Sequence, residues 1–101
     1  MDVQTLFNLG NQFFNEGQTE KAMDMWNRAV SIDRNFREVY INQTNVYRGQ
    51  GNIVREKESI LKFLNSTQTA FSMDLIPPMK QRLMEIEKAL NPQLVQPPPV
   101  R

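Results

Sequence analysis

The feature that most constrains this fold is an internal repeat: the sequence matches itself when it is shifted by 34 residues. The shift places apolar residues on apolar residues and glycine on glycine, in the pairs Leu6–Tyr40, Phe7–Ile41, Phe13–Tyr47, Gly17–Gly51, Trp26–Ile60 and Val30–Leu64. Two asparagines, Asn8 and Asn11, fall in the same way on Asn42 and Asn45. A period of this length is typical of stacked supersecondary units, because one unit alone cannot bury its apolar face. We therefore expect an array in which equivalent residues of the two units lie side by side.

Each unit is predicted to be a pair of helices. Apolar residues recur at three- and four-residue spacing on both sides of Gly17, which suits the left-handed end of a helix. Asp2 is expected to cap the start of the first helix. Helical spacing resumes after residue 36 and is interrupted again around Gly51. The pattern therefore predicts two helical hairpins in succession.

A fifth helix and a proline-rich segment follow. A one-sided apolar stripe predicts a helix over residues 75–90, with Asp74 as its N-cap and with Pro77 and Pro78 in its first turn, where proline is tolerated. Residues 91–101 include three consecutive prolines, which favour an extended polyproline II course. Strand alternation is absent along the sequence, so the predicted fold class is all-α.

The first unit, residues 3–36, resembles a tetratricopeptide repeat (TPR) at the positions Leu6, Leu9, Gly10, Phe13, Gly17, Ala22, Trp26 and Ala29. The second unit, residues 37–70, departs from the family pattern at Thr44 and Glu56, where the family has small residues. A third repeat is absent. The resemblance implies a TPR-like α-solenoid of about five helices over residues 1–90, in which the helix over 75–90 is a cap and residues 91–101 are a tail.

The small residues of the first unit predict a close helix crossing. We expect Gly10 to face Ala22 there, because a glycine inside a helix costs about 1 kcal/mol relative to alanine and close packing has to offset that cost. In the second unit Glu56 occupies the position of Ala22. Its carboxylate is expected either to turn outward or to meet a cation, and the crossing is expected to be wider.

Composition argues against most kinds of chemistry. The chain has 101 residues and a net charge of +1, from twelve basic and eleven acidic residues that form no basic stripe, so no nucleic-acid partner is expected. It contains neither histidine nor cysteine, so we expect no enzymatic activity, no metal site and no cofactor. The start of the sequence lacks a basic, apolar leader, and no apolar run approaches the roughly 18 residues of a membrane span. The expected setting is the cytoplasm or another soluble intracellular compartment.

Asparagines gather on one face of the first helix of each unit. A helical wheel of about 100° per residue places them nearly opposite Leu6 and Gly10, with aromatic residues alongside. The resemblance implies that this face lines the concave groove of the array. The expected partner-binding residues are Phe7, Asn8, Asn11, Phe14, Asn15, Ile41, Asn42, Asn45 and Arg48.

Two interpretations of this face are open, a solvated surface and a groove that binds an extended peptide. Asparagine is a poorer helix former than glutamate or lysine, so its accumulation favours the groove. An amide both donates and accepts, so it can pair with the backbone of a peptide. In the TPR variant that clamps acidic C-terminal tails, Asn11 and Asn42 would match clamp asparagines, but Phe7 stands where a lysine is required. Acidic tails are therefore not the expected ligand.

Two functions remain open from the sequence. The first is an adaptor or scaffold module that captures an extended segment of a partner protein in the asparagine-lined groove. The second is a small structural or assembly subunit of a hetero-oligomeric complex, anchored by its ends, by the proline-rich tail and by Phe71 and Met73. The two functions do not exclude each other.

Overall fold

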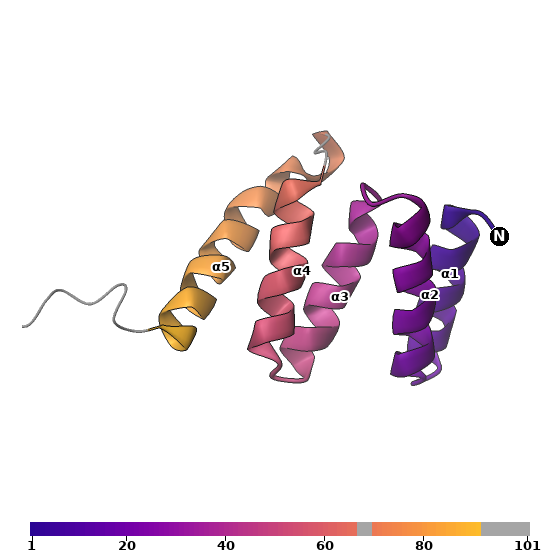
Figure 1. Cartoon of the computed structure of the whole chain (residues 1–101), viewed down its shortest axis with the longest axis horizontal. Helices are drawn as coiled ribbons and strands as arrows, with labels where there is room; N and C mark the ends of the chain where they lie inside the picture. The colour runs from indigo at the N-terminus through magenta and orange to yellow at the C-terminus, as the bar shows by residue number, and fades with distance from the viewer. Residues whose placement is uncertain (67–69, 92–101) are drawn as a thin grey trace, which may run out of the picture. The chain divides into compact units, whose positions relative to one another are not determined.

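The protein is described by a computed structural model that covers residues 1–66 and 70–91, without the side chains of residues 70 and 71. The element order is α1 (Val3–Asn15), α2 (Thr19–Ile32), α3 (Arg37–Gly49), α4 (Ile53–Asn65), a 3₁₀ helix η1 (Ala70–Leu75) and α5 (Ile76–Leu90) (Figure 1). The described residues contain no strand, and the predicted all-α array of helical hairpins is confirmed. The chain divides into two compact units, Met1–Thr67 and Gln68–Arg101. The first of these compact units contains the helices of both 34-residue repeats, and so both hairpins, and the second contains η1 and α5.

The two hairpins turn in the same way. The loop after α1 contains Gly17 with φ of 79°, and the loop after α3 contains Gly51 with φ of 70°. This left-handed conformation is accessible to glycine without a steric penalty. In each loop the backbone N–H of the residue after the glycine donates a hydrogen bond of 2.9 Å to the carbonyl five residues earlier. These bonds run from Gln18 to Phe13 and from Asn52 to Tyr47. The turns of the repeat are therefore equivalent, as the sequence predicts.

Side chains cap two of the helices. The Asp2 carboxylate accepts a hydrogen bond from the backbone N–H of Thr5 at 2.7 Å, which confirms the predicted cap of α1. That bond holds the pKa of Asp2 below its ordinary value of 3.8. The α4 helix begins in a similar way, since Asn52 accepts from the N–H of Arg55 at 3.2 Å.

The predicted cap of the last helix is wrong. The N-cap of α5 is Leu75, which makes no side-chain capping bond, while Asp74 lies inside η1. Because η1 runs directly into α5, Asp74 does not stand at the start of a helix. Pro77 and Pro78 lie in the first turn of α5, as predicted. In α5 the predicted apolar stripe is buried at Met79 and Ile86.

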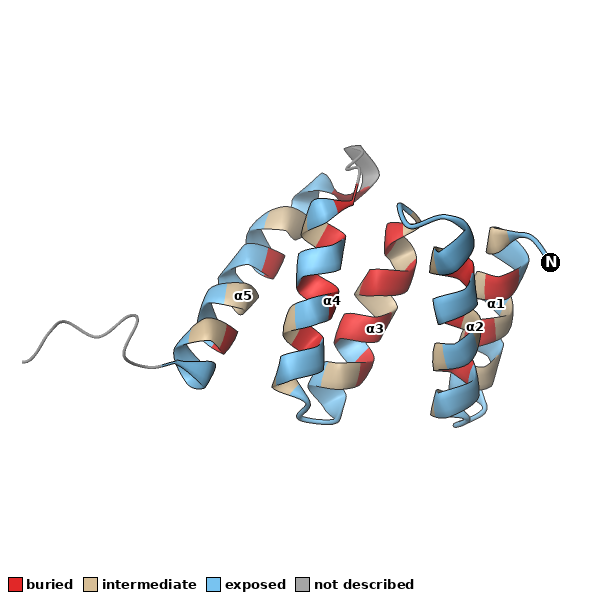
Figure 2. Cartoon of the chain, viewed as in Figure 1, coloured by how far each residue is buried: buried red, intermediate tan, exposed pale blue. Residues whose placement is uncertain are grey.

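The core of the first unit lies between the helix faces that are turned toward one another (Figure 2). Its largest member is Trp26, which is 1% exposed. The buried apolar residues around it belong to α1, α2 and α3: Leu6, Ala22, Ala29, Val39 and Val46. In α4, Ile60 and Phe63 are also fully buried.

The atoms nearest to a side chain added at Gly10 would be those of Trp26, a neighbour that the sequence does not predict. A Cβ atom at Gly10 would lie 2.5 Å from Cδ1 and 3.1 Å from Cε2 of the indole ring. Real Cβ atoms do not approach other atoms so closely. The glycine is therefore required by the large indole ring, which packs directly on the backbone of α1.

The crossing of the second hairpin holds polar side chains. Thr44 and Glu56, the counterparts of Gly10 and Ala22, are both fully buried. Of the two alternatives for Glu56, the structure shows the cation: its Oε2 atom accepts from Nε of Arg48 at 2.9 Å. The Thr44 hydroxyl has no hydrogen-bond partner in the described part of the chain.

Several sequence predictions concern parts that the structure does not describe. They are residues 67–69 of the predicted polar loop, the side chain of Phe71, and residues 92–101 of the proline-rich tail. Within residues 1–66 and 70–91, every helix is too short or too polar to cross a membrane.

Candidate functional site

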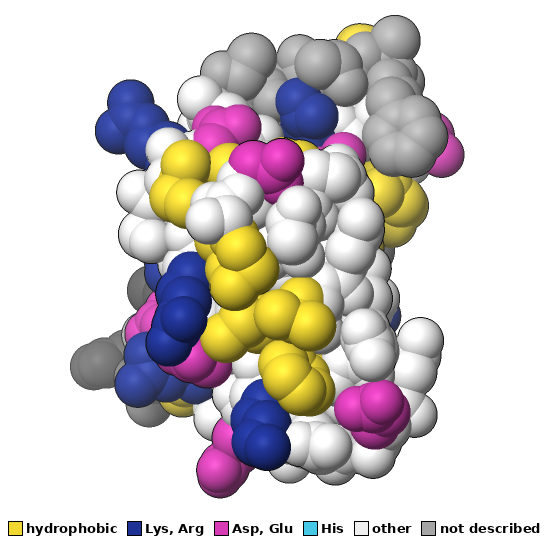
Figure 3. Space-filling view, turned by 90° about the vertical axis from the view of Figure 1, so that its right-hand side faces the viewer, with side chains coloured by type: hydrophobic (Ala, Val, Ile, Leu, Met, Phe, Trp, Pro, Cys, Tyr) yellow, Lys and Arg dark blue, Asp and Glu magenta, His cyan; other side chains and the backbone are white. Residues whose placement is uncertain are grey.

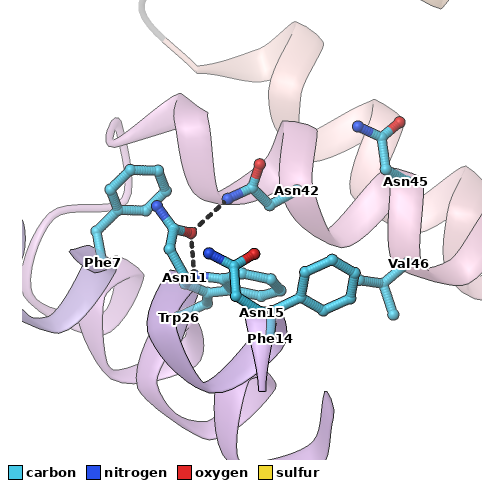
Figure 4. A pocket seen from close by; sticks show the side chains of 8 residues that line it. All are labelled: Phe7, Asn11, Phe14, Asn15, Trp26, Asn42, Asn45 and Val46. Carbon is cyan, nitrogen blue, oxygen red and sulfur yellow. Dashed lines mark hydrogen bonds between the residues drawn. The ribbon is translucent and has the colours of Figure 1, made fainter. Parts of the chain in front are cut away.

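A pocket of about 390 Å³ opens in the first unit and is lined from three helices. We call it the amide pocket. Its lining combines aromatic and apolar side chains with asparagines: Phe7, Asn11, Phe14 and Asn15 of α1, Trp26 of α2, and Asn42, Asn45 and Val46 of α3 (Figure 4). None of these eight side chains carries a charge. Six of the nine predicted partner-binding residues line this one pocket.

The apolar wall of the amide pocket is formed mainly by aromatic rings. The Phe14 ring lies 5.9 Å from the Trp26 ring, measured between centroids, and Phe14 remains 46% exposed. The Phe7 ring packs edge-on against Phe36 with 5.2 Å between centroids. A ligand entering the pocket would therefore meet the exposed face of Phe14 first, against rings that neighbouring residues already hold in place.

Asn11 joins the three helices of the pocket. Its Oδ1 atom accepts from the indole Nε1 of Trp26 at 3.2 Å and from Nδ2 of Asn42 at 2.9 Å (Figure 4). A buried indole N–H needs such a partner, because an unpaired buried donor costs about 1–3 kcal/mol. These bonds use the oxygen of Asn11 and one of the two Nδ2 hydrogens of Asn42. Among the described residues, Nδ2 of Asn11 and Oδ1 of Asn42 have no further hydrogen-bond partner.

Two further amides are available at the pocket surface. Asn15 of α1 and Asn45 of α3 are exposed, and neither makes a hydrogen bond within the part of the chain that the structure describes. They come from different helices and stand on different sides of the pocket (Figure 4). Each offers two donor hydrogens and an acceptor oxygen. The pocket therefore presents donors and acceptors around an aromatic wall.

Three of the predicted site residues do not line the pocket. Asn8 is exposed, and its Oδ1 accepts from Nε2 of Gln4 at 3.0 Å. Ile41 is partly buried outside the lining. Arg48, the third of these residues, already pairs through its guanidinium with Glu56 inside the chain.

Two lining residues were not predicted as part of the site, namely Trp26 and Val46. Both read as core positions and both are buried, Trp26 at 1% and Val46 at 7% exposure, yet both belong to the lining of the pocket. The signal that could have revealed Trp26 is its N–H group. A buried indole requires an acceptor, and the asparagines of α1 are the natural candidates.

A second, polar pocket of about 390 Å³ lies in the same unit, between the α2–α3 connection and the end of α4. Its lining is Arg34, Asn35, Tyr40, Lys62, Asn65 and Ser66. The Tyr40 hydroxyl donates to the backbone carbonyl of Arg34 at 2.6 Å. Burial raises the pKa of Tyr40 above its ordinary value of 10.0, because the charged phenolate is less favourable than the neutral hydroxyl away from water. Its hydrogen is used within the chain, and the pocket lacks an aromatic wall.

Comparisons with protein-family models, curated proteins and solved structures found no match to this chain. The structure defines the class, an all-α array of helical hairpins, while membership of the TPR family stays a prediction that rests on the residues quoted above. Within the described residues, no group of three or more acidic, histidine or cysteine side chains could hold a metal ion.

Proposed function

We propose that this chain is a TPR-like protein–protein interaction module that binds an extended segment of a partner protein in the amide pocket. The observation that carries this proposal is the pairing, in one pocket, of an exposed aromatic wall with amides whose hydrogen-bonding groups are unused. Ligand pockets combine an apolar lining with a few polar groups in this manner, within a range of about 300–1,000 Å³.

The division of labour in the pocket follows from its chemistry. An apolar side chain of the ligand packs on the exposed ring of Phe14, which lies against Trp26, and full burial of a side chain of leucine or phenylalanine size contributes about 1.5–3 kcal/mol. The amides of Asn15 and Asn45 pair with backbone groups of the ligand, so they hold an extended chain without reading its side chains. Asn11 has a double role, because its oxygen accepts from Trp26 and Asn42 and its nitrogen keeps both hydrogens available as donors.

The ligand is expected to be neutral at the bound segment. No charged side chain lines the amide pocket, and Arg48 is engaged by Glu56. A carboxylate or an ammonium in the pocket would lose its hydration without gaining a charged partner. This supports a neutral, partly apolar segment over an acidic tail.

The test is peptide selection followed by a matched set of variants. Peptides selected from a random library on the full chain are titrated while the fluorescence of Trp26, the single tryptophan of the chain, is recorded. We expect Phe14→Ala to weaken binding by ten-fold or more and Asn45→Ala by about three- to ten-fold. Asn8→Ala is the control, since Asn8 has the same side chain on α1 but lies outside the pocket. Equal affinity for Phe14→Ala, Asn45→Ala and the unmodified chain would refute the proposal.

The second candidate function, a permanent subunit of a larger complex, is supported by apolar side chains outside the pocket. Hydrophobic side chains form a band on the outer face of the α1–α2 hairpin (Figure 3). Ile32 of α2 is 60% exposed, and Val54 of α4 is 53% exposed. A permanent subunit would self-associate when purified alone, whereas a peptide-binding module would stay monomeric. Sedimentation of the isolated chain over a wide concentration range separates the two.

A further inference from the structure

Two cationic side chains line the polar pocket of about 390 Å³ that lies between the α2–α3 connection and the end of α4. They are Arg34, which follows α2, and Lys62, which lies in the last turn of α4. Neither cation makes an ion pair with a residue that the structure describes. By contrast, four arginines outside this pocket each pair with a carboxylate: Arg28, Arg48, Arg55 and Arg82. Two positive charges without a carboxylate partner therefore line the same cavity.

Neutral polar groups complete the lining of the polar pocket. The Tyr40 side chain, in a residue that is 5% exposed, donates to the backbone carbonyl of Arg34 at 2.6 Å and so ties the α2–α3 connection to α3. Ser66, which is 8% exposed, donates its hydroxyl hydrogen to a backbone carbonyl of α4 at 2.6 Å. Asn35 and Asn65 are exposed members of the lining, and a side-chain amide carries two donor hydrogens. The lining thus combines buried hydroxyls that the chain holds in place with exposed cations and amides.

The charge of the lining selects the kind of ligand. None of the described lining residues is acidic, and Asp33, which precedes Arg34 in the sequence, is engaged by the backbone N–H of Asn35 at 3.0 Å. A phosphate monoester carries a charge of about −1.5 to −2 at neutral pH, which matches two cations, whereas a carboxylate carries only one negative charge. A guanidinium can bind two phosphate oxygens at once, and an ammonium and amide N–H groups can bind the third. The donors of the lining therefore suit a phosphate group better than a carboxylate.

We propose that the polar pocket is a phosphate-binding site. The guanidinium of Arg34 and the ammonium of Lys62 pair with the phosphate, and the amides of Asn35 and Asn65 donate to its remaining oxygens. The site shares no lining residue with the amide pocket, so this inference does not depend on the proposed function. The phosphate belongs either to a phosphorylated side chain of a partner protein or to a small phosphate ester, since both present the same group.

The first test is a titration of the full, ¹⁵N-labelled chain with inorganic phosphate and, separately, with acetate at the same ionic strength. We expect phosphate to move the backbone amide signals of Asn35 and Asn65, which lie in the polar pocket. The indole signal of Trp26 reports on the amide pocket and is expected to stay in place. Acetate should bind about five-fold more weakly or less, because it carries a single charge.

Matched variants show whether the two cations of the pocket are responsible. Arg34→Gln and Lys62→Gln should each weaken phosphate binding by about three- to ten-fold, a modest factor because both side chains are exposed. Lys57→Gln is the control, since it removes the same charge from α4 at a residue outside the pocket, and it should leave the affinity unchanged. Circular dichroism of each variant confirms that the helices are retained.

Three results would overturn the inference. They are a phosphate titration that moves no signal of the polar pocket, acetate binding as tight as phosphate binding, and an equal loss of affinity in Lys62→Gln and Lys57→Gln, which would show that only the overall charge matters. Once phosphate binding is established, a phosphoserine peptide and glycerol phosphate identify the source of the group. Tighter binding of the peptide assigns the phosphate to a phosphorylated protein, and tighter binding of glycerol phosphate assigns it to a small ester.

Discussion

The two hairpins of the first unit share their turns and differ at their crossings. Both end their first helix on a left-handed glycine, 34 residues apart. At the crossing, the α1–α2 hairpin places the smallest residue, Gly10, beside the largest, Trp26. In the α3–α4 hairpin the same positions hold Thr44 and Ile60, two residues of intermediate size. The repeat therefore determines where the helices turn, while the side chains at the crossing decide what lies between them.

The polar groups of the two crossings lead in opposite directions. In the first hairpin, the buried N–H of Trp26 bonds to Asn11, whose oxygen also bonds to Asn42 at the surface of the pocket. In the second hairpin, the buried carboxylate of Glu56 accepts from the guanidinium of Arg48, whose side chain stays half exposed. The Trp26–Asn11–Asn42 bonds of the first hairpin belong to an uncharged pocket. The Arg48–Glu56 pair of the second hairpin occupies a cation that would otherwise be available to a ligand.

The largest expected effect comes from placing valine at the first crossing. Gly10→Val would force a branched side chain into the space of an indole ring that is 1% exposed. Overpacking of a buried site costs about 1–3 kcal/mol, and we expect about 3 kcal/mol here. Urea unfolding followed by circular dichroism measures the loss. A stability equal to that of the unmodified chain would show that the indole does not depend on the glycine.

The next effect concerns the ion pair of the second crossing. Arg48→Met would leave the fully buried carboxylate of Glu56 without this partner. Breaking a fully buried pair costs about 3–5 kcal/mol, but the Arg48 side chain is half exposed, so we expect about 2 kcal/mol. Adding Glu56→Gln, which removes the charge, should recover roughly half of that loss in the same unfolding experiment. A double variant no more stable than Arg48→Met would argue that the charge is not the cause.

A smaller effect of opposite sign is expected from valine at the second crossing. Thr44 is fully buried, and its hydroxyl has no hydrogen-bond partner in the described residues. Thr44→Val replaces that hydroxyl by a methyl group of similar size and removes a polar group whose burial costs about 1–3 kcal/mol. We expect a gain of about 1 kcal/mol in unfolding free energy. Valine would then destabilise at residue 10 and stabilise at residue 44, and a loss at both positions would contradict the comparison of the two crossings.

The shared parts of the hairpins were predictable because they depend on local chemistry. A left-handed cap needs glycine, and an aspartate ahead of a helix caps it, so Gly17, Gly51 and Asp2 could be assigned from the sequence alone. The repeat then placed the asparagines of α1 and α3 near each other, and the pocket includes both Asn11 and Asn45. The prediction for Asp74 was wrong because this aspartate is the second-last residue of the 3₁₀ helix η1 and does not precede the start of a helix.

The differences between the hairpins were less predictable because they depend on which side chains meet across helices. The spacing suggests that Gly10 faces a small residue, yet the indole of Trp26 takes the space. Whether Glu56 turns outward or meets a cation depends on the reach of Arg48 from the neighbouring helix. Helical periodicity shows on which face of its helix a residue lies, but not which residue of another helix it contacts.

The smallest effect distinguishes the helix caps of the two hairpins by their response to acid. Asp2 caps α1 and Asn52 caps α4 by the same kind of bond, but only the aspartate titrates. Folding lowers the pKa of Asp2 because the carboxylate accepts the N–H of Thr5. A lowered pKa contributes stability above the unfolded value of about 3.9, and that contribution disappears as the pH falls through the folded value. Unfolding curves of the unmodified chain and of Asp2→Asn should therefore differ in stability at neutral pH and converge once the pH has fallen through the lowered pKa of Asp2. Asn52→Asp supplies the reverse case, because it should introduce the same acid sensitivity at α4, and curves that stay parallel in both variants would show that the capping carboxylate is not the cause.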